Sequence, residues 1–223
     1  LIIQHAEEHN LSENGVANES EIATRMGLKG IPSYAESMVV ERDLWLVKET
    51  KCRYHVNHIS TKETVEIIRK AKKNGLPVTC DTSPPYFTLN ELSLENYRTF
   101  SKLNPPLRSE GDRMSIIEGI CDGTIDAISS DHTPQDQDAK RLPFNQAEFG
   151  GVGLETLLPL TLNLVKNNYI KIEELLKLVT VNPAKILNLN CGTINEKLEA
   201  DISVFDLSLP WKINPESFFG KSK

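Results

Sequence analysis

The sequence lacks the features of a membrane protein or a nucleic-acid-binding protein. Its longest apolar run is far shorter than the roughly 18 residues of a membrane-spanning helix. The first residues, 1–5, have neither the basic region nor the cleavage site of a secretory leader. The net charge is −6, whereas binding to phosphate backbones requires clustered lysine and arginine. We therefore expect a cytoplasmic protein with no membrane or nucleic-acid partner.

Cysteine is also scarce and dispersed. None of the four cysteines belongs to a Cys-x-x-Cys pair; they are Cys52, Cys80, Cys121 and Cys191. Scattered thiols are typical of a reducing cytosol rather than of a disulfide framework or a zinc–thiolate site. The chain does not begin with methionine, and its first segment already has the pattern of a strand. We therefore expect the sequence to be a portion of a longer protein.

Short apolar segments alternate with helical patterns along the chain. The segments that predict strands cover residues 1–4, 53–59, 77–81 and 124–129. Such alternation favours a parallel sheet with crossover helices, and so an α/β fold. Four units are too few to close a (β/α)8 barrel, which takes ~250 residues. The pattern therefore predicts half a barrel or a small open sheet.

Helix boundaries support this alternation. One helix is expected over about residues 32–49, with a proline in its first turn. Ser60 and Glu63 have the spacing of a capping box before a second helix. Ser109 and Asp112 are expected to begin a third helix in the same way.

Three residues with metal-binding side chains follow expected strands. His5 follows LIIQ, His58 follows RYHVN and Asp131 follows TIDAISS. Active-site groups of a parallel barrel come from the carboxyl ends of its strands, so we expect these three at one rim. Imidazole and carboxylate groups also suit zinc. Taken singly, each residue has a structural interpretation as a core, capping or turn residue.

Other polar residues near expected strand ends are more ambiguous. His55 lies three positions before His58, and we expect it to face the helices and to be structural. His132 is a candidate for orienting a metal ligand. The proline-rich segment 104–108 either presents Asn104 or Arg108 to an anionic substrate or is simply a rigid loop.

A long polar connection follows the fourth expected strand. Residues 132–151 contain the run QDQDAKR and little that needs burial, so we expect a mobile loop. The loop ends at Phe149 and Gly150 in the motif FGGVG, which opens the next helix. Free backbone N–H groups there would suit an anion or a cyclic amide, although glycine-rich helix starts are common.

Seven motifs together resemble bacterial type I dihydroorotases of the amidohydrolase superfamily. The similarity covers essentially the whole sequence as a C-terminal portion of such a protein, and SDHTPQDQDAKRLPF is similar to an alphaproteobacterial-like branch. The motifs are HAEE (5–8), HISTKE (58–63), LNPPLRSEGDR (103–113), SDHTPQ (130–135), FGGVGLETLLPL (149–160), VNPAKIL (181–187) and ADISVFD (200–206).

This resemblance implies a fold and a domain division. Residues 1–194 would form the second half of an amidohydrolase (β/α)8 barrel, strands five to eight. Residues 195–223 would form part of a small C-terminal β lobe, with a strand at 200–205.

The resemblance also implies a function, the reversible cyclisation of N-carbamoyl-L-aspartate to (S)-dihydroorotate in de novo pyrimidine biosynthesis. His5 and His58 would hold one zinc ion and Asp131 would belong to another. The remaining ligands of these one or two ions would lie in the N-terminal half. A zinc-bound hydroxide would attack the substrate, with Asp131 as general base.

Substrate contacts follow from the same resemblance, with two departures. The residues implied are Asn104, Gln135, Phe149 and Gly150. Pro85 and Tyr86 stand where the family often has two histidines after strand seven. Gln135 replaces a family histidine, and an amide can hydrogen-bond a carboxylate but cannot carry charge.

Two alternative functions remain open from the sequence. Allantoinase and dihydropyrimidinase are cyclic amidohydrolases with the same metal chemistry. A non-catalytic dihydroorotase-like partner of aspartate transcarbamoylase is an alternative of another class, although it has no chemical need for the three ligands. The resemblance also leaves open a homodimer and an association with aspartate transcarbamoylase. We expect this segment alone to be inactive.

Overall fold

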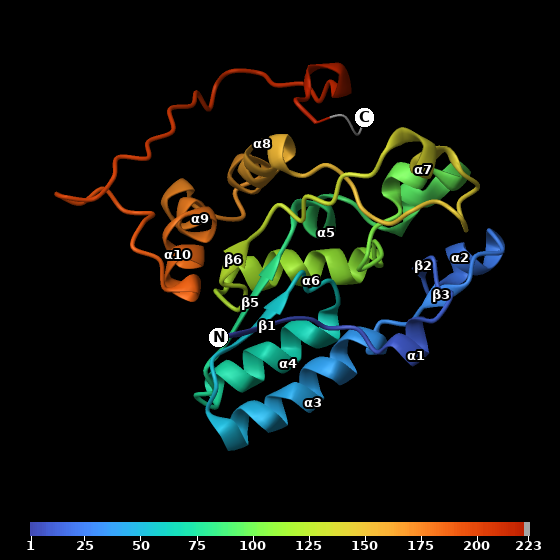
Figure 1. Cartoon of the computed structure of the whole chain (residues 1–223), viewed down its shortest axis with the longest axis horizontal. Coiled ribbons are helices and arrows are strands. Elements are labelled where there is room, and N and C mark those ends of the chain that lie inside the picture. The colour runs from blue at the N-terminus through green and yellow to red at the C-terminus, as the bar shows by residue number, and fades with distance from the viewer. Residues whose placement is uncertain (221–223) are drawn as a thin grey trace.

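The computed structural model describes residues 1–220 and contains a four-stranded sheet covered by helices (Figure 1). The strand order is β1-β4-β5-β6, and every neighbouring pair is parallel. Each strand thus lies beside the next βα unit, which is the arrangement of a (β/α)8 barrel. The expected half barrel is confirmed. The strands are β1 (Ile2–His5), β4 (Tyr54–Asn57), β5 (Val78–Thr82) and β6 (Ala127–Ile128).

Helices α3 (Tyr34–Thr50), α4 (Lys62–Lys73) and α6 (Glu110–Cys121) lie side by side along the sheet (Figure 1). Their apolar side chains form the main core together with Tyr54 and Val56 of β4. Because side chains alternate along a strand, His55 and Asn57 lie on the opposite face. We call this face, which points away from the helices, the inner face, and the edge at the carboxyl ends of the strands the rim.

The expectation that His55 faces the helices is therefore wrong. Its imidazole contacts Thr79 and Asp81, which are inner-face residues of β5. The expectation assumed that the strand alternation continues to His58. The strand ends at Asn57, and His58 has a positive φ of 53°, so the alternation does not extend to it.

The start of α4 also differs from the sequence prediction. Its N-cap is Thr61, whose Oγ1 accepts the backbone N–H of Thr64 at 3.3 Å. Ser60 instead donates its hydroxyl to the buried Glu36, so the predicted Ser60–Glu63 capping box is wrong. The Ser60 hydroxyl bonds Glu36 rather than the helix backbone because a buried carboxylate requires hydrogen-bond donors.

The capping box formed by Ser109 and Asp112 at the start of α6 is confirmed. Other elements lie in the connections or follow the sheet. They are α1 (His9–Ser12), β2 (Ala17–Asn18), α2 (Glu21–Arg25), β3 (Gly30–Ile31), α5 (Pro84–Thr88), η1 (Glu91–Tyr97), η2 (Thr99–Ser101), α7 (Gln137–Arg141), α8 (Leu154–Lys166), α9 (Ile172–Val179) and α10 (Val181–Leu187).

After α10 the chain is extended until η3 (Pro215–Ser217) (Figure 1). Residues 200–205 were expected to form a strand. In the described part of the chain they are exposed and do not pair with another strand. The reason is that a strand requires a neighbouring backbone, and none is paired with them here. The chain returns to α8, where the Phe219 N–H donates to Glu155 Oε1 at 3.1 Å. The division at 194/195 stays a prediction, and residues 221–223 lie outside the described residues.

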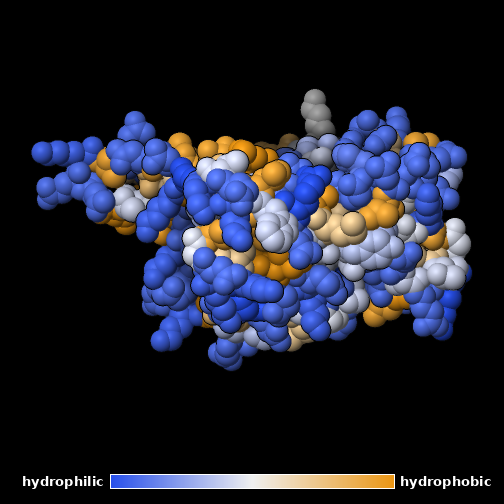
Figure 2. Space-filling model, turned by 90° about the horizontal axis from the view of Figure 1, so that it is seen from below, coloured by the Kyte–Doolittle hydropathy of each residue, from blue (hydrophilic) through white to orange (hydrophobic). Residues whose placement is uncertain are grey.

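Several apolar side chains remain on the surface. Ile2 and Ile3 of edge strand β1 are 54% and 46% exposed, and Trp45 and Leu46 of α3 are exposed as well. Figure 2 shows hydrophobic patches among hydrophilic residues on the face seen from below. An apolar edge strand is typical of a surface that further structure covers. Through residue 220, the helices are all too short or too polar to cross a membrane.

Candidate metal centre and substrate groove

His5, His58 and Asp131 come together at the carboxyl ends of the strands. The ring centroids of His5 and His58 lie 6.3 Å apart. The Nε2 atom of His58 lies 3.5 Å from Oδ1 of Asp131. The structure therefore brings the three residues to one rim, as the sequence predicts. Their role as metal ligands stays a prediction.

Two of these residues have an unusual backbone conformation. His58 has a φ of 53° and Asp131 a φ of 46°. For a residue with a side chain this left-handed region is sparsely populated and costs about 1 kcal/mol or more. Backbone strain of this kind gathers at functional sites. The conformation therefore supports a functional interpretation of both residues, independently of their chemistry.

Asp81 holds His58 from the neighbouring strand β5. Its Oδ1 accepts the backbone N–H of His58 at 2.8 Å and lies 3.1 Å from Nδ1 of the same residue. The Ser129 hydroxyl donates to this oxygen at 2.9 Å, while Oδ2 lies 3.0 Å from Nε2 of His55. A carboxylate on one imidazole nitrogen leaves the other nitrogen for a metal.

Sequence reasoning placed Asp81 in a strand but assigned it no role. The available signal was an acidic residue at the end of an otherwise uncharged segment, PVTCD. Its partner His55 was interpreted as a residue of the helix layer, so the connection between the two was missed.

The electrostatics of the rim depend on burial and on these close contacts. Burial alone would lower the pKa of His58, but Asp81 and then Asp131 raise it above its ordinary value. Burial would raise the pKa of Asp81, but hydrogen bonds from His55 and His58 hold it well below its usual range. Burial raises the pKa of Asp131, although His58 and His5 oppose this effect. Asp81 is therefore a fixed anion, whereas Asp131 binds a proton more readily.

The donor set fits part of a zinc site. Two imidazoles and a carboxylate are suitable zinc ligands, and His58 presents a nitrogen that Asp81 leaves free. Within residues 1–220, however, there is no group of three or more His, Cys, Asp or Glu residues that could hold a metal ion. Zinc sites use three or four protein ligands. The rim therefore has the chemistry of a zinc site but not a full set of ligands.

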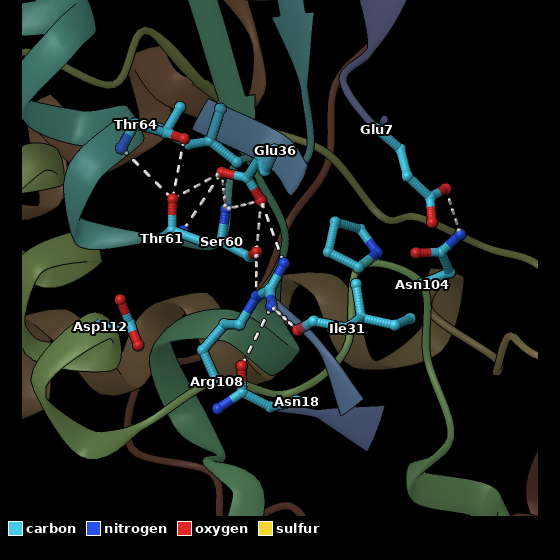
Figure 3. Close-up of polar contacts among 12 residues, drawn as sticks. Glu7, Asn18, Ile31, Glu36, Ser60, Thr61, Thr64, Asn104, Arg108 and Asp112 are labelled. Atoms are coloured by element: carbon cyan, nitrogen blue, oxygen red, sulfur yellow. Dashed lines mark hydrogen bonds and ion pairs between the residues drawn. The ribbon is translucent and has the colours of Figure 1, made fainter. Parts of the chain in front are cut away.

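Glu7 connects the rim to a predicted substrate residue (Figure 3). Its Oε2 accepts Nδ2–H of Asn104 at 3.0 Å and lies 3.7 Å from Nε2 of His5. The contact with His5 lowers the pKa of Glu7 to about 2, although burial opposes this shift. Asn104 thus lies beside the rim, and an ionised carboxylate orients its amide.

Arg108 is not available to a substrate, because it is only 4% exposed. Its Nη1 donates to Oδ1 of Asn18 at 3.0 Å and to the carbonyl of Ile31 at 2.9 Å (Figure 3). Nε donates to the Ser60 hydroxyl at 3.1 Å, and Nη2 lies 4.0 Å from the Glu36 carboxylate. Arg108 therefore has a structural role, because it ties its own loop to the segments that contain Asn18, Ile31 and Ser60. Asn104 is then the remaining substrate candidate in the proline-rich segment.

The other predicted substrate residues, Gln135, Phe149 and Gly150, are held by hydrogen bonds within the fold. Gln135 donates its side-chain amide to the carbonyl of Phe149 at 2.9 Å, and the Gly150 N–H donates to the carbonyl of Lys102 at 3.0 Å. Gly150 has a φ of 111°, and a Cβ atom there would lie 2.5 Å from the carbonyl oxygen of Thr133. This position therefore requires glycine.

A groove of about 600 Å³ runs beside these residues. Asn104 and Phe149 line it, so it contains two of the four predicted substrate residues. Ionisable side chains of both signs also line it, which suits a small polar ligand. They are Glu7, Lys29, Lys102 and Glu148.

The start of α8 is already hydrogen-bonded. Nδ1 of His132 accepts the backbone N–H of Gly153 at 3.0 Å and that of Leu154 at 3.4 Å. The N–H groups of Gly153, in the glycine-rich motif, and of the next residue, Leu154, are therefore not free for an anion. His132, considered from the sequence as an orienting residue for a metal ligand, joins the segment after β6 to α8.

The connection 132–151 contains more secondary structure and more buried side chains than its sequence predicts. It contains helix α7 and buries Lys140, Phe144 and Ala147, which are 1%, 4% and 3% exposed. The expectation that it has little to bury is wrong, because Lys140 extends inward to backbone carbonyls. Its mobility stays a prediction.

Comparisons with known proteins show the family and its extent. The profile of the Amidohydrolase family matches residues 1–223. The chain is 45% identical to a dihydroorotase of Ehrlichia chaffeensis over 224 residues, covering 100% of this chain and 50% of that protein. It is also 45% identical to a dihydroorotase of Acetivibrio thermocellus over 223 residues, covering 100% of this chain and 52% of that protein. The chain thus spans about half the length of these relatives.

Solved structures agree on the fold. The L-hydantoinase (dihydropyrimidinase) of Arthrobacter aurescens has a TM-score of 0.76 at 28% identity, covering 89% of this chain and 46% of that one. A dihydropyrimidinase of Brevibacillus agri has a TM-score of 0.75 at 21% identity, with the same coverage of 89% and 46%, and this second likeness shows the fold alone.

Proposed function

Because the chain belongs to the amidohydrolase family, we propose that it is the C-terminal half of a dihydroorotase. The proposed reaction is the reversible cyclisation of N-carbamoyl-L-aspartate to (S)-dihydroorotate in de novo pyrimidine biosynthesis. The observation that carries the proposal is the convergence of His5, His58 and Asp131 beside Asn104. The 45% identity to dihydroorotases supports this choice of substrate.

We assign His5 and His58 to one zinc ion and Asp131 to a second. Zinc, when bound, acts as a Lewis acid and supplies an ionised water near neutral pH. Asp81 directs Nε2 of His58 towards the rim by holding Nδ1. The missing ligands belong to the part of the protein outside this sequence, so the segment alone is expected to be inactive.

Asp131 acts as the general base in the direction of hydrolysis. Its carboxylate accepts a proton from the attacking water and delivers it to the ring nitrogen as the amide bond breaks. In the cyclisation direction the same carboxylate takes the proton from that nitrogen as the C–N bond forms and returns it to the oxygen that leaves as water. Burial raises the pKa of Asp131, which makes the carboxylate a better proton acceptor, while nearby His58 and His5 favour its anion.

Asn104, Gln135, Phe149 and Gly150 bind the substrate in this proposal. Amide N–H donors suit the substrate carboxylate, and the neutral Gln135 binds it without contributing charge. Glu7 holds the amide of Asn104 and so sets which of its atoms faces the groove. Pro85 and Tyr86 stand where the family often has two histidines, so any contribution of those histidines to substrate binding is absent here.

The second candidate is an allantoinase-type or dihydropyrimidinase-type hydrolase, and the likeness to an L-hydantoinase (dihydropyrimidinase) bears on the second of these. Turnover of dihydroorotate, hydantoin, dihydrouracil and allantoin by the complete protein distinguishes them. We expect turnover of dihydroorotate alone, and preferential turnover of any other ring would overturn the assignment. Zinc content tests the non-catalytic alternative, since a scaffold of aspartate transcarbamoylase needs no metal.

The proposal also places the protein in the cytoplasm. It also includes two partners, a second copy in a homodimer and aspartate transcarbamoylase, and sedimentation without and with that enzyme tests each of them.

A further inference from the structure

Two lysines are buried between residues 133–151 of the connection that follows β6 and the loop that leads to Asn104. Lys102 is 2% exposed and Lys140 is 1% exposed. Both lie outside the predicted metal rim, and the proposed mechanism uses neither. A buried ammonium group is costly unless its protons are hydrogen-bonded, so the contacts of each lysine show what it holds in place.

Lys140 hydrogen-bonds backbone carbonyls of its own segment and of the loop that leads to Asn104. Its Nζ donates to the carbonyls of Thr99 and Lys102 at 3.2 and 3.3 Å. It also donates to the carbonyl of Glu148 at 2.7 Å, next to Phe149. All three ammonium protons thus have acceptors, and these belong to two segments far apart in sequence.

Lys102 makes the reciprocal set of contacts. Its Nζ donates to the carbonyls of Phe144, Asn145 and Ala147 at 2.9, 3.3 and 2.6 Å. The same Nζ lies 4.6 Å from the centroid of the Phe149 ring. Each lysine therefore extends from its own segment into the other.

These contacts adjoin the proposed substrate residues on both sides. Lys102 precedes Asn104 by two positions, and its carbonyl accepts the N–H of Gly150 at 3.0 Å. Gln135 is bonded to Phe149 and so belongs to the same assembly. Breaking one lysine contact would leave a buried polar group without a partner, which gives the arrangement a single preferred geometry.

We propose that Lys102 and Lys140 form a clamp that sets substrate affinity by holding Gln135, Phe149 and Gly150 against the loop carrying Asn104. This inference rests on the proposed function for the identity of the substrate. Lys102 also lines the groove, whereas Lys140 is not among its lining residues. Lys140 is therefore a positioning residue, and it provides the cleaner test.

The test compares variants of the complete protein with zinc bound. Lys140→Met keeps the length of the side chain but removes its donors, and Lys140→Arg keeps donors and charge. Lys73→Met, at an exposed lysine of α4, is the matched control. Hydrogen exchange reports the amides of residues 133–151, and steady-state kinetics with dihydroorotate report KM and kcat.

We expect Lys140→Met to speed exchange within residues 133–151 and to raise KM about 10-fold, with kcat changed less than about 2-fold. Lys140→Arg should raise KM less than Lys140→Met does. Lys73→Met should leave KM and the exchange rates unchanged. A folded Lys140→Met protein with unchanged KM would overturn the proposal, as would equal losses in kcat and kcat/KM.

A second measurement covers the case in which Lys140→Met does not fold. Dihydroorotate must then slow exchange of residues 133–151 in the wild-type protein, and an unchanged rate there overturns the clamp's role in binding. A zinc-loaded wild-type protein that does not turn over dihydroorotate overturns the proposed function instead. In that case the exchange rates of the variants still decide whether the clamp exists.

Discussion

Oδ1 of Asp81 lies 3.1 Å from Nδ1 of His58 and accepts the backbone N–H of the same residue at 2.8 Å. One buried carboxylate thus orients both the ring and the main chain of a predicted metal ligand. Such supporting residues commonly change metal affinity without touching the metal.

Asp81→Asn should lower zinc affinity of the complete protein about 10–100-fold, because an amide orients the imidazole more weakly and does not raise its basicity. Competition with a chromophoric chelator measures the affinity without relying on activity. Asp201→Asn, at an exposed position, is the control. An affinity equal to that of the wild type would remove Asp81 from the site.

Asp131→Asn should lower kcat at least ~10²-fold while changing KM little, as loss of a general base does. Asn104→Ala and Gln135→Ala should mainly raise KM, since both are proposed to bind the substrate. Steady-state kinetics with dihydroorotate separate the two patterns. Small and equal effects from all three variants would contradict these roles.

Arg108→Met should destabilise the fold by about 3–5 kcal/mol, because Glu36 would remain buried without its cation. Glu36 is only 3% exposed, so water cannot replace the arginine. Denaturant unfolding measures the change in the free energy of unfolding. Arg25→Met, in an exposed pair with Glu21, should cost less than about 1 kcal/mol. Similar losses in both variants would mean that Arg108 is not structural.

The stability of the protein should depend on pH through Lys140. Burial, and then the neighbouring Lys102, lower the pKa of Lys140 from 10.5 to about 8. Between these values the unfolded chain keeps a proton that the folded protein has released, so the contribution of Lys140 to stability rises with pH across this window. Unfolding free energies of the wild type and Lys140→Met should therefore diverge in favour of the wild type from pH 8 to pH 10.5. A difference that shrinks with rising pH would contradict this sign.

The 223-residue segment alone should bind zinc weakly and should not hydrolyse dihydroorotate. Zinc requires three or four protein ligands, and the segment offers two histidines for one ion and an aspartate for the other. Equilibrium dialysis and a turnover assay on the purified segment test this. Two tightly bound zinc ions with turnover like that of the complete protein would overturn it.

Local sequence patterns were sufficient to predict the strands of the four-stranded sheet and the rim, but not β2 and β3. Strands β1, β4, β5 and β6 are short apolar segments between helix signals, and their parallel pairing follows from the crossover helices. Parallel strands present their carboxyl ends at one edge, so the meeting of His5, His58 and Asp131 could be predicted without coordinates. The resemblance to dihydroorotases supplied the chemistry of that edge.

Long-range pairing lies outside the reach of such patterns. Whether Ser60 caps a helix or binds Glu36 depends on a buried carboxylate 24 positions away. Residues 200–205 have the composition of a strand, yet strand formation depends on a neighbouring backbone rather than on composition. The positive φ of His58 reverses an alternation that period-two reasoning would extend.

The sequence alone was therefore enough to predict that His5, His58 and Asp131 meet at one rim, because each follows a strand and parallel strands end at the same edge. Only the tertiary structure shows which buried groups support the site: Asp81 contacts His58, and Lys140 donates to the carbonyl of Glu148, next to Phe149. A buried charge is placed by whatever distant donors or carbonyls can satisfy it. That requirement is met in three dimensions, and no spacing along the chain encodes it.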